Sequence, residues 1–419
     1  MPNTQTKPRR SPISPFGSPS HAKAAVPDDV KAKIAAFNKQ FGNHGDEHVQ
    51  VLSQNPVWSL ADIVGQAGAD AIERAGSISF HSVGDTGFDS FPLNQRTGET
   101  RFDQVNKQFA TAQEALISAM TSDTGERIEV GPAFLFHLGD VNYFDNTRSG
   151  YAQQFFEPFA NYPRKIIAIP GNHDVEVAIS QQKFACQAFI ENFCGAAVPP
   201  AAAGVSPVRE MAPQPGLYWR LDTPFVQIIG LCTNVGEGGG VLRSQAAGED
   251  QYDWFKRTLK EVKAGQDQDG AKRRALIIGL HHPPFTNGNH ASSPQMNQDL
   301  DDAFSEAGVW PDLVLAAHDH DYQRFTRTVE LPGGSTVDIP YIVAGGGGRY
   351  HSQFGGGGGG PMDPVPGVNQ EASEKGNGYL IVTAAPFRVE IAYVAIDHAN
   401  QNSNEAISVD LRTRRITKR

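Results

Sequence analysis

The chain has 419 residues and a formal net charge of −10 at pH 7. Hydrophobic residues make up 39% of it and charged residues 20%, which is typical of a soluble globular protein. The acidic balance argues against nucleic acid or an anionic membrane as a constitutive partner. The sequence contains no run of about 18 apolar residues, so it predicts no membrane-spanning helix. Three cysteines are too few for a disulfide framework or a thiolate zinc site. Because no signal peptide is recognisable, we expect a cytoplasmic protein.

Two segments precede the expected core. Residues 1–26 are rich in Pro, Ser, Lys and Arg and lack periodicity, which predicts a disordered arm. Residues 27–76 predict a helical extension. A short amphipathic helix is expected at 27–41, and a second apolar pattern begins at Leu60 and ends at Gly76.

From residue 77 onward, short apolar runs alternate with amphipathic stretches. The runs predict buried strands and the stretches predict helices, an alternation typical of a mainly parallel sheet covered on both faces. We therefore expect a catalytic domain over 77–396 and a C-terminal tail at 397–419, in which the basic stretch from Arg412 to Arg419 is solvated. The expected strands are 78–83, 133–138, 165–169, 225–231, 275–280, 313–316, 341–344, 379–384 and 387–394, and the expected helices are 102–120, 151–160 and one from 249 to about 262.

Several long loops interrupt this alternation. The irregular insertion at 175–217 is expected to form a cap, because structureless loops of that length are uncommon as linkers. The glycine runs at 345–348 and 355–360 are expected to be flexible backbone near the site, since neither continues as a phosphate-binding Gly-Lys-Ser/Thr motif. The loops expected to shape the pocket are 88–101, 175–217, 285–299 and 345–377.

Polar clusters follow five of the expected strands. Each has an ordinary explanation, since an Asp after Gly is commonly a turn residue and a His near a strand end is commonly a hydrogen-bonded rim residue. Five together are harder to explain that way, and we expect them to converge on one edge of a parallel sheet, where such folds bind ligands. The clusters are Asp85, Asp140 with Tyr143, Asn172 with His173, His281 with His282, and His318 with His320.

The side-chain types in these clusters indicate metal chemistry. Carboxylate, phenolate, amide and imidazole ligands without thiolate suit iron, zinc or manganese. Seven ligands are enough for two ions that share one carboxylate. Ions about 3.5–4 Å apart lower the pKa of a bridging water and hold a phosphoryl group for in-line attack, while a neighbouring imidazole can protonate the leaving oxygen. The residues therefore predict metal-assisted phosphoester hydrolysis.

The clusters form an ordered set of motifs that resembles the calcineurin-like metallophosphoesterases. Within them the chain is most similar to purple acid phosphatases, because Gly87 follows the first aspartate by two positions and Tyr143 ends the second motif. The resemblance covers roughly 77–396 and implies a four-layer α/β/β/α sandwich of two mixed sheets flanked by helices. The motifs are Asp85-Thr-Gly87, Gly139-Asp140-Val-Asn-Tyr143, Gly171-Asn172-His173-Asp174, His281-His-Pro283 and Ala317-His318-Asp-His320-Asp-Tyr322-Gln-Arg324.

The resemblance also implies a role for each motif residue. His173 would contact the phosphate and act as general acid, Asp174 would orient it, and His282 would lie outside the metal ligands. The implied ligands of a ferric ion, Fe3+, are Asp85, Asp140, Tyr143 and His320, and those of a divalent ion (Fe2+, Zn2+ or Mn2+) are Asp140 again with Asn172, His281 and His318.

The expected function is that of a binuclear phosphomonoesterase, acid phosphatase-like, in which a metal-bridging hydroxide attacks a small phosphoester. A phosphodiesterase acting on a cyclic nucleotide or another diester is the alternative, because the same site can attack either ester. A non-catalytic metal-binding scaffold of the same fold is the second alternative, although competent residues occupy all seven ligand positions and position 173. The sequence does not identify the physiological substrate.

Overall fold

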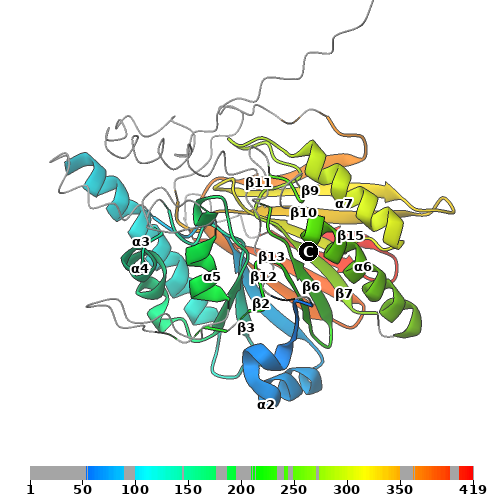
Figure 1. Cartoon of the computed structure of the whole chain (residues 1–419), viewed down its shortest axis with the longest axis horizontal. Helices are drawn as coiled ribbons and strands as arrows, with labels where there is room; N and C mark the ends of the chain where they lie inside the picture. The colour runs from blue at the N-terminus through cyan, green and yellow to red at the C-terminus, as the bar shows by residue number, and fades with distance from the viewer. Residues whose placement is uncertain are drawn as a thin grey trace, which may run out of the picture.

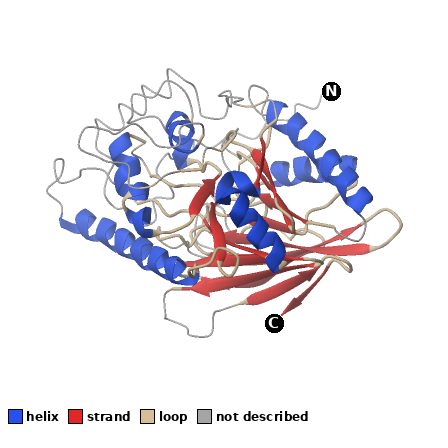
Figure 2. Ribbon diagram, turned by 90° about the horizontal axis from the view of Figure 1, so that it is seen from below, coloured by secondary structure: helices blue, strands red, loops and turns tan. Residues whose placement is uncertain are grey.

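Two mixed β-sheets form the centre of the computed structural model, and helices cover their outer faces (Figures 1 and 2). This arrangement confirms the expected four-layer α/β/β/α sandwich. The expected arm at 1–26 and helix at 27–41 lie outside the described residues. The structure describes residues 53, 55–88, 100–143, 146–175, 186–194, 209, 211–212, 214–233, 240–243, 249–269, 273–349, 362, 364–396 and 405–418.

The first sheet has seven strands in the order β15-β14-β13-β12-β2-β3-β4. Its parallel part, β2 to β4, is almost entirely buried, because these strands are covered on both faces, and it includes the buried polar side chains of His81, Ser82 and His137. The remaining strands pair antiparallel, and β12 and β13 form the expected hairpin. The strands are β2 (Ile78–Val83), β3 (Pro132–His137), β4 (Lys165–Ala168), β12 (Gly378–Ala385), β13 (Arg388–Ala395), β14 (Ala406–Asp410) and β15 (Arg415–Lys418).

The second sheet has eight strands in the order β1-β5-β6-β7-β8-β10-β9-β11. It packs on the first sheet through a shared apolar core, in which the rings of Phe136 and Trp219 lie 5.3 Å apart. A side chain at Gly279 would collide with Phe136, so this glycine lets the sheets approach closely. The strands are β1 (Val57–Ser59), β5 (Trp219–Asp222), β6 (Val226–Gly230), β7 (Ala275–Gly279), β8 (Leu313–Ala316), β9 (Tyr322–Glu330), β10 (Thr336–Ala344) and β11 (Val368–Glu374).

The helices largely follow the expected apolar patterns. The second helix of the extension ends as predicted, with Gly76 at φ 81° as its C-cap, although Gly65 interrupts it. The helix expected at 151–160 is divided into short α-, π- and 3-10-helical segments between residues 148 and 161. The helices and turns are α2 (Leu60–Ala75), α3 (Thr100–Asp123), α4 (Arg148–Tyr151), η3 (Ala152–Phe156), η4 (Pro158–Asn161), η5 (His173–Val175), α5 (Gln187–Phe193), α6 (Glu249–Asp269) and α7 (Pro294–Ala307).

Part of the segment expected as a C-terminal tail forms two strands of the first sheet, although most described residues of its basic stretch are exposed, as expected. Residues 406–410 and 415–418 are strands β14 and β15, which extend the first sheet beyond β13. Ile407 and Val409 are buried, and their alternation with polar residues is a short strand signal that the tail interpretation overlooked. The carboxylate of Asp312 also forms ion pairs with Arg414 (3.4 Å) and Arg273 (2.8 Å), which fixes the end of the chain to the second sheet.

Helix α7 lies in a region expected to be a loop. Its start carries two signals that the loop interpretation overlooked, since the Ser293 hydroxyl accepts a hydrogen bond from the Met296 amide and Pro294 occupies the first turn. Strands β9 and β11 were also missed. β11 is a largely exposed, polar edge strand, so apolar periodicity could not reveal it.

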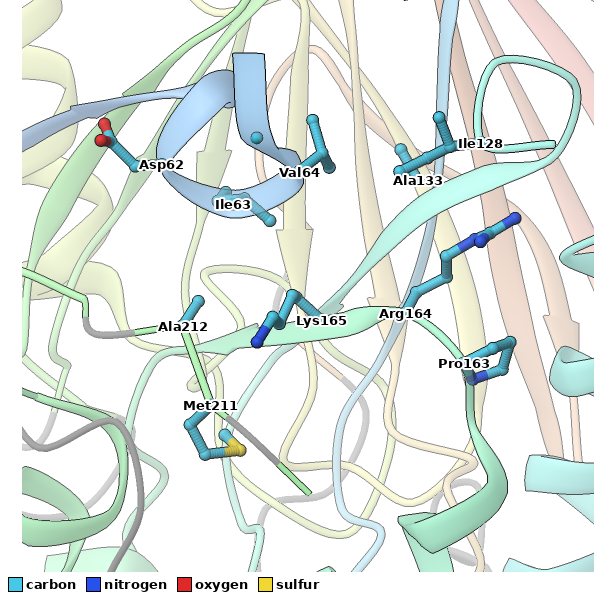
Figure 3. Close-up of a pocket in the computed structure, with 11 residues that line it drawn as sticks. Asp62, Ile63, Val64, Ile128, Ala133, Pro163, Arg164, Lys165, Met211 and Ala212 are labelled. Carbon is cyan, nitrogen blue, oxygen red and sulfur yellow. The ribbon is translucent and has the colours of Figure 1, made fainter. Parts of the chain in front are cut away.

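A cavity of about 420 Å³ lies between α2 and the start of β4, and its lining includes Asp62, Arg164, Lys165 and Met211 (Figure 3). It is at the opposite end of β4 from the predicted ligands, and none of those ligands lines it. Within the part of the chain that the structure describes, no helix is long and apolar enough to cross a bilayer.

Candidate metal centre

The predicted ligands converge, but not on one edge of a single parallel sheet. That expectation is wrong because the ligands follow strands of both sheets: β2, β3 and β4 belong to the first sheet, and β7 and β8 to the second. The two groups meet through direct bonds. The His318 amide donates to Asp85 Oδ2 at 2.9 Å, and His281 Nδ1 lies 2.8 Å from the Leu138 carbonyl oxygen. The site therefore bridges the two sheets.

One group of ligands surrounds the Asp85 carboxylate. The Tyr143 hydroxyl donates to Asp85 Oδ1 at 3.1 Å and lies 3.1 Å from His320 Nε2. His320 Nε2 is also 3.5 Å from Asp85 Oδ1. All three side chains are buried. With Asp140 they are the four expected ligands of one ion.

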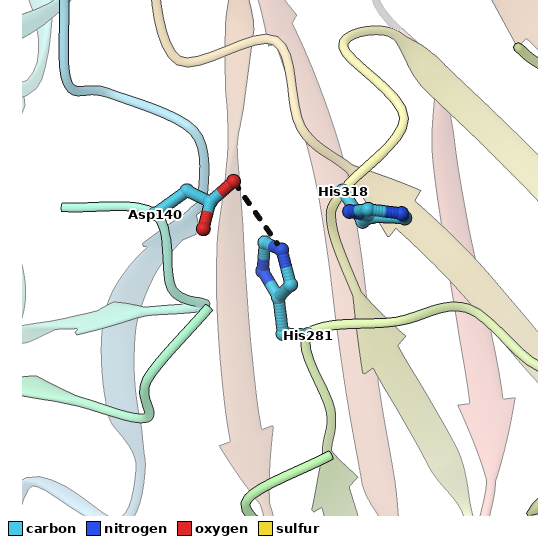
Figure 4. A group of neighbouring side chains, drawn as sticks. All are labelled: Asp140, His281 and His318. Atoms are coloured by element: carbon cyan, nitrogen blue, oxygen red, sulfur yellow. Dashed lines mark ion pairs between the residues drawn. The ribbon is translucent and has the colours of Figure 1, made fainter. Parts of the chain in front are cut away.

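A second group adjoins it around Asp140. Asp140, His281 and His318 each offer one ligand atom, and these atoms lie within 4.8 Å of one another (Figure 4). His281 Nε2 is 3.5 Å from Asp140 Oδ2 and 3.1 Å from Asn172 Oδ1. Because the Leu138 carbonyl can only accept, His281 Nδ1 carries the proton of that bond, which leaves Nε2 directed toward Asp140 and Asn172.

Burial controls the protonation of this centre. Asp85 and Asp140 are 0% and 1% exposed, and burying carboxylates is costly unless they are paired or bind a metal. Burial lowers the pKa of His281, but the Asp140 charge outweighs it and raises that pKa to about 9. The same negative field would attract a metal cation. Burial, reinforced by neighbouring imidazoles, holds the pKa of His318 well below its usual value, so His318 is neutral and can act as a ligand.

The backbone is strained at three predicted ligands. Asp85 (φ 59°), Asp140 (φ 53°) and His318 (φ 71°) adopt positive φ angles, which cost about 1–3 kcal/mol each and concentrate at functional sites. Among described residues other than glycine, only three more adopt such angles. The rest of the fold therefore offsets this conformational strain, and the strained backbone directs the three side chains toward the centre.

Comparison with known proteins places this architecture in a family. Residues 78–322 match the family model described as calcineurin-like phosphoesterase. The chain belongs to the calcineurin-like phosphoesterase family. It is similar to probable purple acid phosphatase 20 of Arabidopsis thaliana, with 28% identity over 129 residues, which are 30% of this chain and 26% of that protein. The chain thus matches about a quarter of the length of that relative.

Two solved structures are also similar to this chain. GAP50, the anchor in the inner membrane complex of Plasmodium, has a TM-score of 0.49 at 11% identity, over 78% of this chain and 87% of its own. A dimetal phosphatase from Danio rerio has a TM-score of 0.40 at 10% identity, over 80% and 99% of the two chains.

The glycine run at 345–348 of this family member is packed, not flexible as expected. A side chain at Gly345 would collide with the Asp319 carbonyl and come within 2.7 Å of Asp85 Oδ2. A side chain at Gly347 would collide with the Gly84 carbonyl. These glycines allow the backbone after β10 to press directly on the loop that carries Asp85. The second run, at 355–360, lies outside the described residues.

The predicted general acid, His173, lies beside the predicted ligands Asp140 and Tyr143. The His173 amide donates to Asp140 Oδ1 at 2.9 Å, and its ring packs on Tyr143 with centroids 4.4 Å apart. Asp174 was expected to orient the His173 ring. Its carboxylate accepts hydrogen bonds from the backbone amides of Gly171 (2.7 Å) and Val141 (3.2 Å), so it fixes the loop backbone that positions His173, and an orienting contact with the ring stays a prediction.

His282 packs against the predicted ligand His318, and its place outside the metal ligands stays a prediction. Its Nδ1 is 2.8 Å from the Thr233 hydroxyl, and its ring lies 4.4 Å from that of His318. Packing of the His282 ring therefore helps to hold the His318 ring in place. The contact with the Thr233 hydroxyl fixes the orientation of His282.

Two further residues adjoin the site and were not predicted from the sequence. The His290 ring lies 4.0 Å from that of His318, and the Arg349 guanidinium carbon lies 4.2 Å from the Tyr143 ring centroid. Both occur in regions expected only to shape the pocket. A lone histidine in a loop and an arginine after a glycine run carry no periodic signal, so only the fold shows where they lie.

Proposed function

We propose that this chain is a phosphoester hydrolase with two metal ions, acting on phosphomonoesters. One observation supports it most directly. Asp140, His281 and His318 each offer a ligand atom, and these atoms lie within 4.8 Å of one another, close enough to bind one metal ion. The adjoining Asp85 and Tyr143 supply oxygen donors to the same buried space. Oxygen and imidazole donors without thiolate fit iron, zinc or manganese.

The proposed ligand sets divide between the two groups of side chains. Bound ions would supply Lewis-acid activation of water and neutralise phosphoryl charge. Asp140 would be shared, because it adjoins both His281 and the loop that carries Tyr143. The proposed ligands of a ferric ion are Asp85, Asp140, Tyr143 and His320, and those of a divalent ion are Asp140, Asn172, His281 and His318.

The remaining side chains would act on the substrate. His173 would donate a proton to the leaving oxygen. The hydrogen bond from its backbone amide to Asp140 places its ring beside the centre without using the ring as a metal ligand. The positive charge of Arg349, stacked on Tyr143, favours an anionic substrate near this face. Similarity to a protein named as a purple acid phosphatase supports monoesters over diesters.

An activity screen with metal analysis tests the proposal. Protein reconstituted with iron and zinc should bind two ions per chain and hydrolyse aryl and alkyl phosphomonoesters faster than the matching diesters and triesters. Asp140→Asn should weaken both metal sites, and Asp222→Asn, a partly exposed control in β5, should bind both ions normally. Faster turnover of diesters would favour a phosphodiesterase. If the protein binds two ions but hydrolyses none of the esters, the result would favour a non-catalytic metal-binding scaffold.

A further inference from the structure

The loop after β7 is anchored to the turn that carries His318 and His320. The anchor is Asp319, whose side chain is fully buried. Its Oδ2 accepts a hydrogen bond from the Thr286 hydroxyl, and its Oδ1 accepts one from the His290 amide at 3.0 Å. One carboxylate therefore holds both ends of the 286–290 turn.

The turn is built closely around this carboxylate. The Thr286 hydroxyl also accepts hydrogen bonds from the Gly288 amide and from Gln323 Nε2, each at 3.0 Å. A side chain at Gly288 would collide with the Asp319 carboxylate. The Asn287 amide donates to Gln323 Oε1 at 2.8 Å. These contacts fix the turn to β9 and leave it little freedom to move separately from the metal ligands.

The consequence of this anchor is the position of His290. Its ring centroid lies 4.0 Å from that of His318 and 6.2 Å from that of His320. Since the His290 amide is one of the two groups bound by Asp319, loss of the carboxylate would release the backbone that carries this ring.

We propose that Asp319 is a positioning residue, which anchors the 286–290 turn and thereby holds the His290 imidazole against the ligand pair His318 and His320. An uncharged amide at position 319 keeps the shape of the side chain, but its NH₂ group cannot accept a hydrogen bond. One of the two anchoring bonds must then be lost.

The position of His290 can be measured without activity. In zinc-loaded protein with ¹⁵N-labelled histidine rings, the His290 signals are identified by their loss in His290→Gln. Asp319→Asn should shift these signals. Asp299→Asn, which changes a buried carboxylate of α7 that accepts a hydrogen bond from Gln295 Nε2 and lies outside this turn, should leave them in place. Unmoved His290 signals in Asp319→Asn would overturn the proposal.

A double-mutant cycle then tests whether Asp319 acts through His290. This measurement rests on the proposed function. Asp319→Asn should lower kcat/KM for a phosphomonoester by about tenfold in the wild type but by less than about twofold in His290→Gln, because coupled residues are not additive. Equal losses in both backgrounds would overturn the positioning role. A wild type without activity would refute the proposed function, while the ring signals would still decide the placement.

A second variant covers the case in which Asp319→Asn does not fold. Thr286→Val removes one anchoring hydroxyl at nearly constant volume and leaves the carboxylate in place. It should shift the same His290 signals and show the same dependence on the His290 background. Unshifted signals in folded Thr286→Val would also count against the anchor.

Discussion

Replacing His173 by Asn should separate proton donation from phosphate binding. The backbone amide that bonds Asp140 remains in the variant, so the loop and its metal ligands should stay in place. The loss to folding is the packing of the ring on Tyr143, and an aromatic pair contributes about 0.5–1.5 kcal/mol. General acid catalysis contributes roughly 10²–10⁴-fold, which is about 3–5 kcal/mol in the barrier. The catalytic effect should therefore exceed the structural one.

The assay compares kcat/KM for two esters, with metal content measured beside it. An alkyl phosphate has a poor leaving group and should lose about 10²–10⁴-fold in His173→Asn, whereas an aryl phosphate with an electron-poor ring should lose far less. His81→Asn is the matched control, because His81 is also a buried histidine but bonds Tyr162 away from the site. It should leave the ratio of the two rates unchanged. Equal losses for both esters in His173→Asn would refute proton donation. Loss of a metal ion would refute the ligand assignment around Asn172.

Three further outcomes are expected. Tyr143→Phe should remove the visible charge-transfer band of the iron-loaded protein while the fold is retained, and a band of unchanged intensity at equal iron content would refute phenolate ligation. Burial lowers the pKa of His81, although the nearby Asp123 carboxylate opposes this, so the unfolded state takes up a proton first and the free energy of unfolding should fall as pH drops below about 6.5. In urea unfolding the fall should be steeper than in His81→Phe by up to about 1.4 kcal/mol per pH unit. Identical slopes in the two proteins would contradict this. Asp312→Ala should lower the free energy of unfolding by about 3 kcal/mol, because it leaves Arg273 and Arg414 without their buried partner. A loss below about 1 kcal/mol would mean that these ion pairs contribute no more than pairs on the surface.

The sequence by itself determined the strands that carry the ligands. Runs such as 166–169 and 275–280 are apolar without interruption because both faces of each strand are buried, and a proline follows each run within three residues. The polar residues after each break are therefore visible along the chain. Their order was sufficient to identify the family, which the match over residues 78–322 confirms.

The tertiary structure decided how these strand ends meet. Asp85 and His318 are 233 positions apart, yet a hydrogen bond joins them across two different sheets. Local periodicity has a range of a few residues, so it could not distinguish one sheet from two. The same limit hid strands β14 and β15, whose short alternating pattern gains its stability from pairing with β13 and from the ion pairs of Asp312. His290 also carries no local signal, because its position depends on a carboxylate 29 residues away.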